Sequence, residues 1–336
     1  MSAPDALGPE ALADARREQP RRGLLGLLFV LPATALLAVG WGGPVSTFTV
    51  LGPLLTFALP IVAVIAFWWQ DWPGSLLGGG WSGLGDTAIV AVGGVLLALL
   101  GQGLLEGVDL QGVFQRGASA EVPLAVAIFG VILQLTLVGE GWPLRGLPRL
   151  WSGLAALALC WLIGLVVYSG LVRVVGGEVL VSWFAALGVW QMVWYVALRG
   201  WPFARIRGRA ARLVTAHLTV IACGWVSYLA AERVLGWEPG RIAEVSGSAI
   251  AAILVVAMLF EGWPAIRLAE IPGRGLVLVL AAALTAALST LLPLLATRLF
   301  GLSEREALSW STHTTLNALS LAVILHVAVW RRWLAD

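Results

Sequence analysis

Residues 138–154 read VGEGWPLRGLPRLWSGL, and this stretch contains the pattern that organises the chain. One apolar run ends at Trp142-Pro143, and the next begins at Trp151-Ser-Gly-Leu154. The Trp-Pro pair occurs four times, at Trp72-Pro73, Trp142-Pro143, Trp201-Pro202 and Trp263-Pro264. The intervals are 70, 59 and 62 residues, and Trp81-Ser-Gly-Leu84 repeats the second motif after Trp72. A period of this length predicts an array of similar units.

The composition is typical of a membrane protein. Hydrophobic residues make up 59% and charged residues 12% of the 336 positions, and the mean hydropathy is +0.90. Soluble domains carry about 25% charged residues, whereas runs of about 20 apolar residues indicate bilayer spans. The apolar runs lie at about 23–41, 47–69, 86–105, 122–139, 151–172, 180–198, 211–231, 246–261, 275–297 and 312–330. We therefore expect an all-α polytopic membrane protein with about ten transmembrane helices.

The spans fall into five units, each an outward helix, a short outer loop and an inward helix that ends near Trp-Pro. Proline cannot continue a helix and tryptophan favours the headgroup level, so we expect each Trp-Pro pair to be a structural stop and anchor. Every unit runs in the same direction, which predicts five parallel two-helix repeats in a single transmembrane domain, 23–336. Their approximate bounds are 23–75, 76–145, 146–205, 206–267 and 268–336.

The arginines predict the orientation. All 21 basic residues are arginine; 15 lie in the Trp-Pro loops and the two terminal segments, and 6 lie on the other side. The positive-inside rule therefore places both termini, including the N-terminal segment 1–22, and every Trp-Pro loop in the cytoplasm. Arginine without lysine is typical of a GC-rich bacterial genome, so we expect the bacterial inner membrane. The arginine run at 199–212 lies between two spans and predicts contact with anionic lipid headgroups rather than with nucleic acid.

Several kinds of chemistry are excluded or disfavoured. The absence of lysine excludes a Schiff base, and no Cys/His cluster has the spacing of a metal site. Cys160 and Cys223 lie in apolar runs and are expected to pack as small hydrophobic residues. No acid lies at the centre of a span, which argues against a carboxylate proton relay. The inward helices are instead expected to begin near carboxylates that favour a helix N-terminus, at Glu121, Glu178, Glu244 and Glu306.

Polar residues on the last span give the best candidate for a binding cavity. They recur every three or four residues and so share one helical face: Ser309, Thr312, His313, Asn317 and Ser320. Such a face either packs against other helices through hydrogen bonds or lines a wet cavity. Gln134 and Gln191, on other spans, could face the same cavity.

Two further histidines lie at matched depths. His217 follows Arg212 by five residues, and His326 precedes Arg331 by five, so both lie about 7 to 8 Å from the cytoplasmic arginines. Equal depth would suit a shared haem or metal site, although two separate histidines bonded to neighbouring helices are the simpler interpretation. No cofactor is otherwise expected.

Three function classes remain open. A permease for a small apolar or weakly polar solute fits ten spans, short loops and a polar stripe. An accessory or assembly subunit of a larger membrane complex fits the scarcity of reactive groups. A membrane-embedded enzyme or haem protein would depend on His217, His313 and His326. The expected partners are therefore the lipid bilayer and either a solute or other membrane subunits, and whether the protein is an enzyme stays undecided.

Overall fold

The computed structural model describes residues 17–70, 72–115 and 121–332, and most of the N-terminal segment 1–22 therefore lies outside the described residues. Regular structure in the described part is entirely helical. Nine helices in that part are long and apolar enough to cross a bilayer, and Val122–Val138 is a shorter apolar helix. These helices coincide with the expected spans and indicate a membrane protein.

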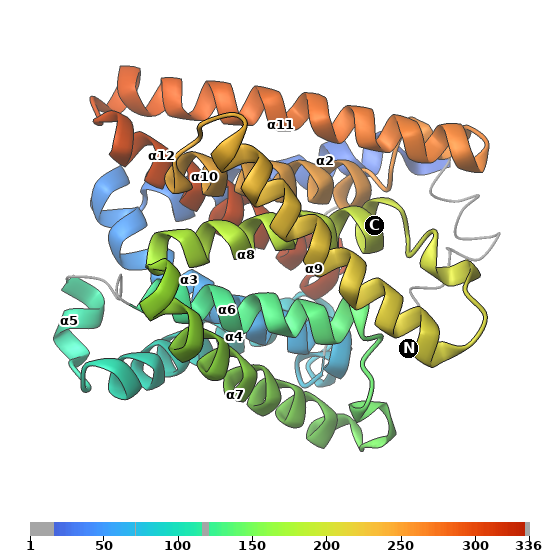
Figure 1. Ribbon diagram of the computed structural model, residues 1–336, viewed down its shortest axis with the longest axis horizontal. Coiled ribbons are helices and arrows are strands. Elements are labelled where there is room, and N and C mark those ends of the chain that lie inside the picture. Colours follow the sequence, from blue (N-terminus) through green and yellow to red (C-terminus); the bar gives the residue numbers. More distant parts are fainter. Residues whose placement is uncertain (1–16, 71, 116–120, 333–336) are drawn as a thin grey trace.

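The helices run roughly parallel to one another (Figure 1). They form an inner set and an outer set. The outer helices are α2 (Arg21–Val39), α4 (Gly79–Leu105), α7 (Arg149–Val175), α9 (Arg209–Arg233) and α11 (Glu270–Phe300). The inner helices are α3 (Pro44–Ala63), α6 (Val122–Leu133), α8 (Gly177–Met192), α10 (Pro239–Ile253) and α12 (Glu304–Thr312), the last continuing through η10 (His313–Leu319) and α13 (Ser320–Ile324). Burial separates the layers: 78% of the most apolar window of the α3 span is buried, against 17% for α11. Outer helices leave leucine and valine side chains exposed, as lipid-facing helices do.

The inner helices close on themselves. In the described chain, α3 contacts α6, α6 contacts α8, α8 contacts α10, α10 contacts α12, and α12 with η10 returns to α3. Each outer helix from α4 onward packs mainly on the inner helix that precedes it in the sequence, and α2 packs on η10 and α13 at the end of the chain. The bundle is therefore closed by its first and last helices.

Glycines allow the two layers to approach closely. A Cβ on Gly164 of α7 would lie 2.6 Å from the side chain of Ile128 on α6. A Cβ on Gly224 of α9 would lie 2.9 Å from Cα of Leu187 on α8. Small residues at such crossings let helix backbones pack against each other where lipid provides no hydrophobic driving force.

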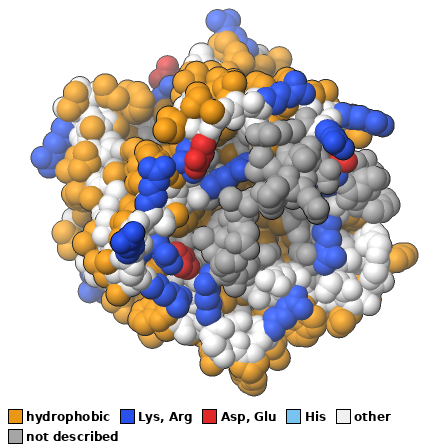
Figure 2. Space-filling view, turned by 90° about the vertical axis from the view of Figure 1, so that its right-hand side faces the viewer, with side chains coloured by type: hydrophobic (Ala, Val, Ile, Leu, Met, Phe, Trp, Pro, Cys, Tyr) orange, Lys and Arg blue, Asp and Glu red, His pale blue; other side chains and the backbone are white. Residues whose placement is uncertain are grey.

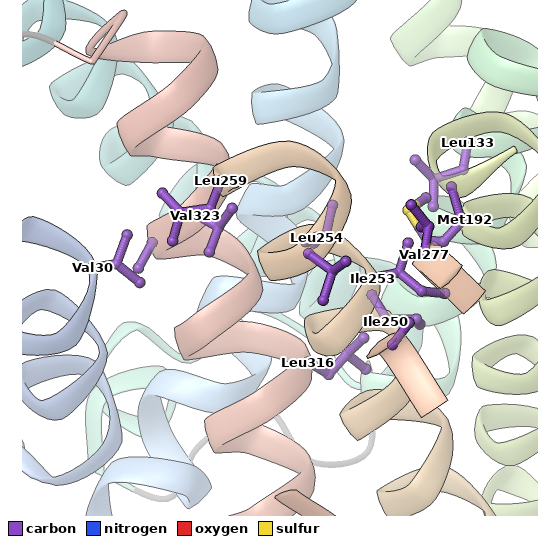
Figure 3. Close-up of a cluster of buried hydrophobic side chains, with 14 of the residues drawn as sticks. Val30, Leu133, Met192, Ile250, Ile253, Leu254, Leu259, Val277, Leu316 and Val323 are labelled. Atoms are coloured by element: carbon purple, nitrogen blue, oxygen red, sulfur yellow. The ribbon is translucent and has the colours of Figure 1, made fainter. Parts of the chain in front are cut away.

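Apolar side chains from several inner helices meet in one large cluster (Figure 3). Leu133, Met192 and Ile253 contribute from three inner helices, and Val30 joins from α2. Phe129 packs against this cluster and against two others, and so connects them. The described interior is thus held mainly by packing.

Inner helices share one way of ending. Each passes into a π-helical turn: η1 (Val64–Trp69), η4 (Gln134–Val138), η6 (Val193–Ala197), η8 (Leu254–Leu259) and η11 (Leu325–Val329). A non-glycine residue with positive φ follows one or two residues later, at Gln70, Glu140, Arg199, Glu261 and Arg331. Left-handed backbone stops a helix, so these polar residues, each two before a tryptophan, end the inner helices.

Trp-Pro loops lead from each stop to the next outer helix. All four Trp-Pro peptide bonds are cis, and short 3₁₀ turns follow: η2 (Gly74–Leu76), η5 (Leu144–Gly146), η7 (Phe203–Arg205) and η9 (Ala265–Arg267). At the opposite end lies a short helix that the sequence did not predict, α5 (Leu110–Gln115).

Glu261 holds the two ends of the described chain together. Its carboxylate accepts a hydrogen bond from Nε2 of Gln19 at 3.2 Å and pairs with Nη1 of Arg332 at 2.7 Å. Arg332 also donates to the carbonyl of Met258 at 3.0 Å. The start of α2 and the end of the last inner helix therefore meet at the same loop.

Candidate functional site

A pocket of about 800 Å³ opens at the Trp-Pro end of the bundle. It lies among the ends of three inner helices, the loop after η4, and the first turns of α7 and α9. Its lining comprises Phe67, Trp68, Gln70, Thr136, Leu137, Glu140, Gly141, Arg145, Leu147, Arg149, Ser152, Tyr195, Gly200, Phe203, Ala204, Arg209 and Arg212. Figure 2 shows this end of the molecule, where several arginine side chains lie among hydrophobic side chains.

The lining is strongly basic. Among the described lining residues, four arginines accompany a single carboxylate, Glu140. Arg212 is held by that carboxylate through its Nη2 at 2.9 Å and its Nε at 2.8 Å. Arg149 donates from Nη2 to the carbonyl of Gln70 at 2.5 Å. Two of the arginines are thus fixed by the protein, and one of these is neutralised.

Arg145 and Arg209 form the second half of the basic lining. Within the described chain neither has a hydrogen-bonded or ion-paired partner. Partial burial lowers the pKa of the Arg145 guanidinium, and the Glu140 carboxylate opposes this shift. The positive charges of Arg209 and Arg212 lower the pKa of Arg145 further. Among the residues that the structure describes here, positive charges therefore outnumber negative ones.

Aromatic side chains form the apolar part of the wall. Tyr195 and Phe203 stack with their ring centroids 6.2 Å apart. Trp68 is oriented by a hydrogen bond from its indole N–H to Oγ1 of Thr136 at 3.1 Å. The pocket therefore combines cationic groups with apolar surface, the usual composition of a site for an organic ligand rather than a bare ion.

A hydrogen-bonded chain of three side chains lies deeper in the bundle. Gln191 donates from Nε2 to the carbonyl of Gly130 at 3.0 Å and to Oε1 of Gln134 at 2.8 Å. The amide of Gln134 lies 2.8 Å from Nδ1 of His217. A carbonyl only accepts, so Gly130 fixes the orientation of Gln191, which fixes that of Gln134. Nδ1 of His217 must then accept, and the neutral imidazole carries its proton on Nε2.

These three side chains lie near the pocket but outside its lining. They are three to five residues, or about 4 to 8 Å, further from the Trp-Pro end than lining residues on the same helices. Those lining residues are Leu137, Tyr195 and Arg212. Sequence analysis grouped Gln134 and Gln191 with the polar stripe of the last span, whereas the structure joins both to His217.

The polar stripe itself contacts α2 and α3. Nε2 of His313 lies 2.8 Å from the carbonyl of Leu37, and Asn317 donates to the carbonyl of Gly52 at 3.2 Å. Thr56 donates to Oδ1 of Asn317 at 3.4 Å. These bonds join three helices.

The other stripe hydroxyls bond within their own segment, Ser309 to Arg305, Thr312 to Leu308 and Ser320 to Thr315. None of the seven proposed cavity residues lines the pocket at the Trp-Pro end or a smaller one near Trp41 and Phe114. The stripe as a cavity lining therefore stays a prediction.

His217 and His326 have separate surroundings. His217 contacts Gln134, whereas the ring of His326 is buried and stacks on Phe29 with centroids 5.4 Å apart. Among the described residues there is no group of three or more His, Cys, Asp or Glu side chains that could hold a metal ion. A haem shared by these two histidines stays a prediction that rests on their depth alone.

The outer carboxylates differ from one another. Glu306 forms a capping box with Ser303 at the start of α12, as a helix-end role requires. Glu244 instead lies inside α10, where it is buried, pairs with Arg241 at 2.8 Å and accepts from Ser248 at 3.2 Å. The sequence placed it at the helix start because the apolar run begins only after it, but the helix begins at Pro239.

The tryptophans of the Trp-Pro loops are in several environments. Trp142 is 57% exposed, and Trp72 meets Trp69 edge to face at 5.5 Å. The guanidiniums of Arg205 and Arg274 lie 5.9 and 5.4 Å from the ring centre of Trp201. Partly exposed indoles with cationic neighbours are compatible with anchoring at a headgroup layer.

The sequence did not predict that the pocket arginines lie together. Arg145 and Arg149 were interpreted as signs of orientation, and Arg209 and Arg212 also as part of a run that contacts anionic lipid headgroups. The available signal was Glu140, the single acid in the described lining, because one carboxylate cannot neutralise four guanidiniums. Comparison with protein-family models, curated proteins and solved structures gave no match.

Proposed function

We propose that the protein is a permease-like integral membrane protein, and that the pocket at the Trp-Pro end is its solute site. The observation that carries this proposal is the pocket itself, which opens at one end of a closed helix bundle and extends among three inner helices. Its four arginines favour an anionic solute, in place of the small apolar or weakly polar solute expected from sequence. Aromatic lining accounts for an apolar portion of that solute.

The proposal includes the arrangement of the helices as five parallel two-helix repeats. Support comes from the shared ending of the inner helices and from the regular order in which the outer helices cover them. The arginines gathered at the Trp-Pro end support a cytoplasmic orientation of that end in a bacterial inner membrane. The pocket then faces the cytoplasm.

Transport can be tested on the full chain reconstituted in liposomes of phosphatidylcholine. Charge movement across a solid-supported membrane would be recorded with inorganic phosphate, glycerol 3-phosphate and hexanoate. We expect a current with at least one of these anions and its loss in Ala204→Trp, because Ala204 lines the pocket. The matched control is Ala210→Trp, an exposed position outside the lining. Absence of current with every anion, or equal currents in the two variants, would contradict the proposal.

A further inference from the structure

We infer that the pocket recognises a phosphate group carried on an apolar body, with Arg145 and Arg209 as the groups that bind the phosphate. This inference rests on the proposed function only in taking the pocket as the solute site. The ligand chemistry is that of an alkyl or acyl phosphate, whether it comes from the bilayer or from the cytoplasm.

The charge of the lining suits a phosphate better than a carboxylate. Arg212 and Glu140 neutralise one another, which leaves three positive charges in the described lining, on Arg145, Arg149 and Arg209. A phosphate monoester carries about 1.5 to 2 negative charges at neutral pH, and a carboxylate carries one. Guanidinium forks also match the oxygen geometry of phosphate through paired N–H donors. A phosphate therefore balances more of the excess charge.

The two groups assigned to phosphate are the lining arginines that have no hydrogen-bonded or ion-paired partner among the described residues. Arg149 is already committed to the carbonyl of Gln70, and Arg212 to Glu140. Arg145 and Arg209 are near enough for each charge to act on the other. An anion between them would relieve this repulsion and could accept a pair of parallel N–H bonds from each guanidinium.

The remaining wall fits the apolar body of the ligand. Four aromatic side chains belong to the lining: Phe67, Trp68, Tyr195 and Phe203. A volume of about 800 Å³ is in the range of pockets for whole organic molecules, far above the needs of one ion. The cation pair and the aromatic wall together require a ligand with a charged end and an apolar end.

Apolar residues near the mouth place the pocket close to the bilayer interface. Leu147 belongs to the lining and is 44% exposed. Leu150 and Trp151, at the start of α7, are also exposed. Exposed tryptophan beside arginine is typical of the headgroup layer, and basic pockets between transmembrane helices bind anionic headgroups. A phospholipid phosphate can therefore enter from the side as readily as a soluble phosphate from water.

Binding is tested by native mass spectrometry of the full chain in a neutral detergent. The probes are phosphatidic acid and phosphatidylcholine with the same acyl chains. We expect wild-type protein to prefer phosphatidic acid by about tenfold, the range of one charge-assisted contact. Arg145→Gln and Arg209→Gln should each abolish most of that preference. Arg267→Gln, which removes an exposed arginine of the same end outside the lining, should leave it unchanged.

Glycerol 3-phosphate distinguishes the two sources. If it displaces phosphatidic acid at low millimolar concentration, the ligand is a soluble phosphate; if it does not, the ligand is a lipid. Equal binding of the two lipids, or an equal loss in Arg267→Gln and Arg145→Gln, overturns the inference. Selective binding without any transport current refutes the permease and retains the phosphate site. A transport current with hexanoate that is unchanged in Arg145→Gln refutes the phosphate site and retains the permease.

Discussion

Two polar regions of this protein differ in whether the chain satisfies them. His313 and Asn317 form hydrogen bonds with residues of α2 and α3. These bonds use most of the donors and acceptors of the two side chains. Arg145 and Arg209, at the Trp-Pro end, have no such partners in the described chain. Polar groups satisfied by the protein stabilise the fold, whereas positive charges left open toward a pocket are available to a ligand. The two polar regions therefore differ in whether the described chain satisfies their hydrogen-bonding groups, and only the second leaves charged groups open toward a pocket.

The largest loss of unfolding free energy is expected at Glu261, which bonds to Gln19 and Arg332 at the two ends of the described chain. Glu261→Ala removes the carboxylate that binds Gln19 and Arg332, whose guanidinium is then left largely buried. Breaking one side of a buried ion pair costs about 3–5 kcal/mol. Denaturant unfolding of the purified protein should show that loss. Glu270→Ala is the control, since Glu270 is 67% exposed in its pair with Arg274 and should cost under about 1 kcal/mol. Equal losses in both variants would show that Glu261 does not hold the ends.

A smaller effect is expected at Asn317. Asn317→Ala removes the hydrogen bonds that join Asn317 to Gly52 and Thr56, while the carbonyl of Gly52 keeps its bond from Oγ1 of Thr56 at 2.8 Å. Two lost bonds should cost about 1–3 kcal/mol of unfolding free energy. Phosphatidic acid binding should not change. Cysteine at 317, in a chain without Cys160 and Cys223, should be inert to an impermeant thiol reagent. Rapid labelling there would instead support the cavity that sequence analysis proposed for this face.

An intermediate loss of stability is expected in the hydrogen-bonded chain of Gln191, Gln134 and His217. His217→Leu removes the acceptor for the amide of Gln134, which is only partly buried, so we expect a loss of about 1 kcal/mol. Chemical denaturation measures this, and the absorbance spectrum of the wild-type protein tests the haem hypothesis on the same sample. A Soret band that disappears in His217→Leu would assign the histidine to haem instead of to this hydrogen-bonded chain.

The smallest effect on stability is expected at the proposed binding site. Arg145→Gln removes an exposed charge without a protein partner, so the unfolding free energy should change by no more than about 0.5 kcal/mol. The same variant should lose most of its preference for phosphatidic acid. Strong destabilisation of this variant would show that Arg145 stabilises the fold, which would contradict the distinction between the two polar regions.

Much of the fold follows from local sequence. Apolar runs predicted the membrane helices because length and hydropathy are local properties, and even the short helix at Val122–Val138 was expected. The polar residue two before each tryptophan was visible too, but its left-handed backbone was not. The fifth such residue, Arg331, was missed because Leu334, not proline, follows its tryptophan at position 333.

The site could not be predicted in the same way. Its arginines come from the loop after η4, from α7 and from α9, so their grouping depends on how three inner helices pack. Gln134 and Gln191 were correctly singled out as polar groups inside spans, yet nothing local shows that His217 completes their chain. Periodicity identifies a helical face, whereas the partner of that face is a tertiary property.

The packing of α2 on α13 has a consequence for how the protein is made. Of the described helices, the ribosome makes α2 first and α13 last, so α2 can pack on α3 early but lacks its contacts with η10 and α13 until the last described helix is made. Until then the face of α2 that carries the buried Val30 must contact lipid or the insertion machinery. A ring also has no privileged starting point. A circularly permuted protein, opened at the Trp263-Pro264 loop and with its original ends joined, should therefore form the same bundle. A different helix would then be made first and would lack its final contacts until the end of synthesis.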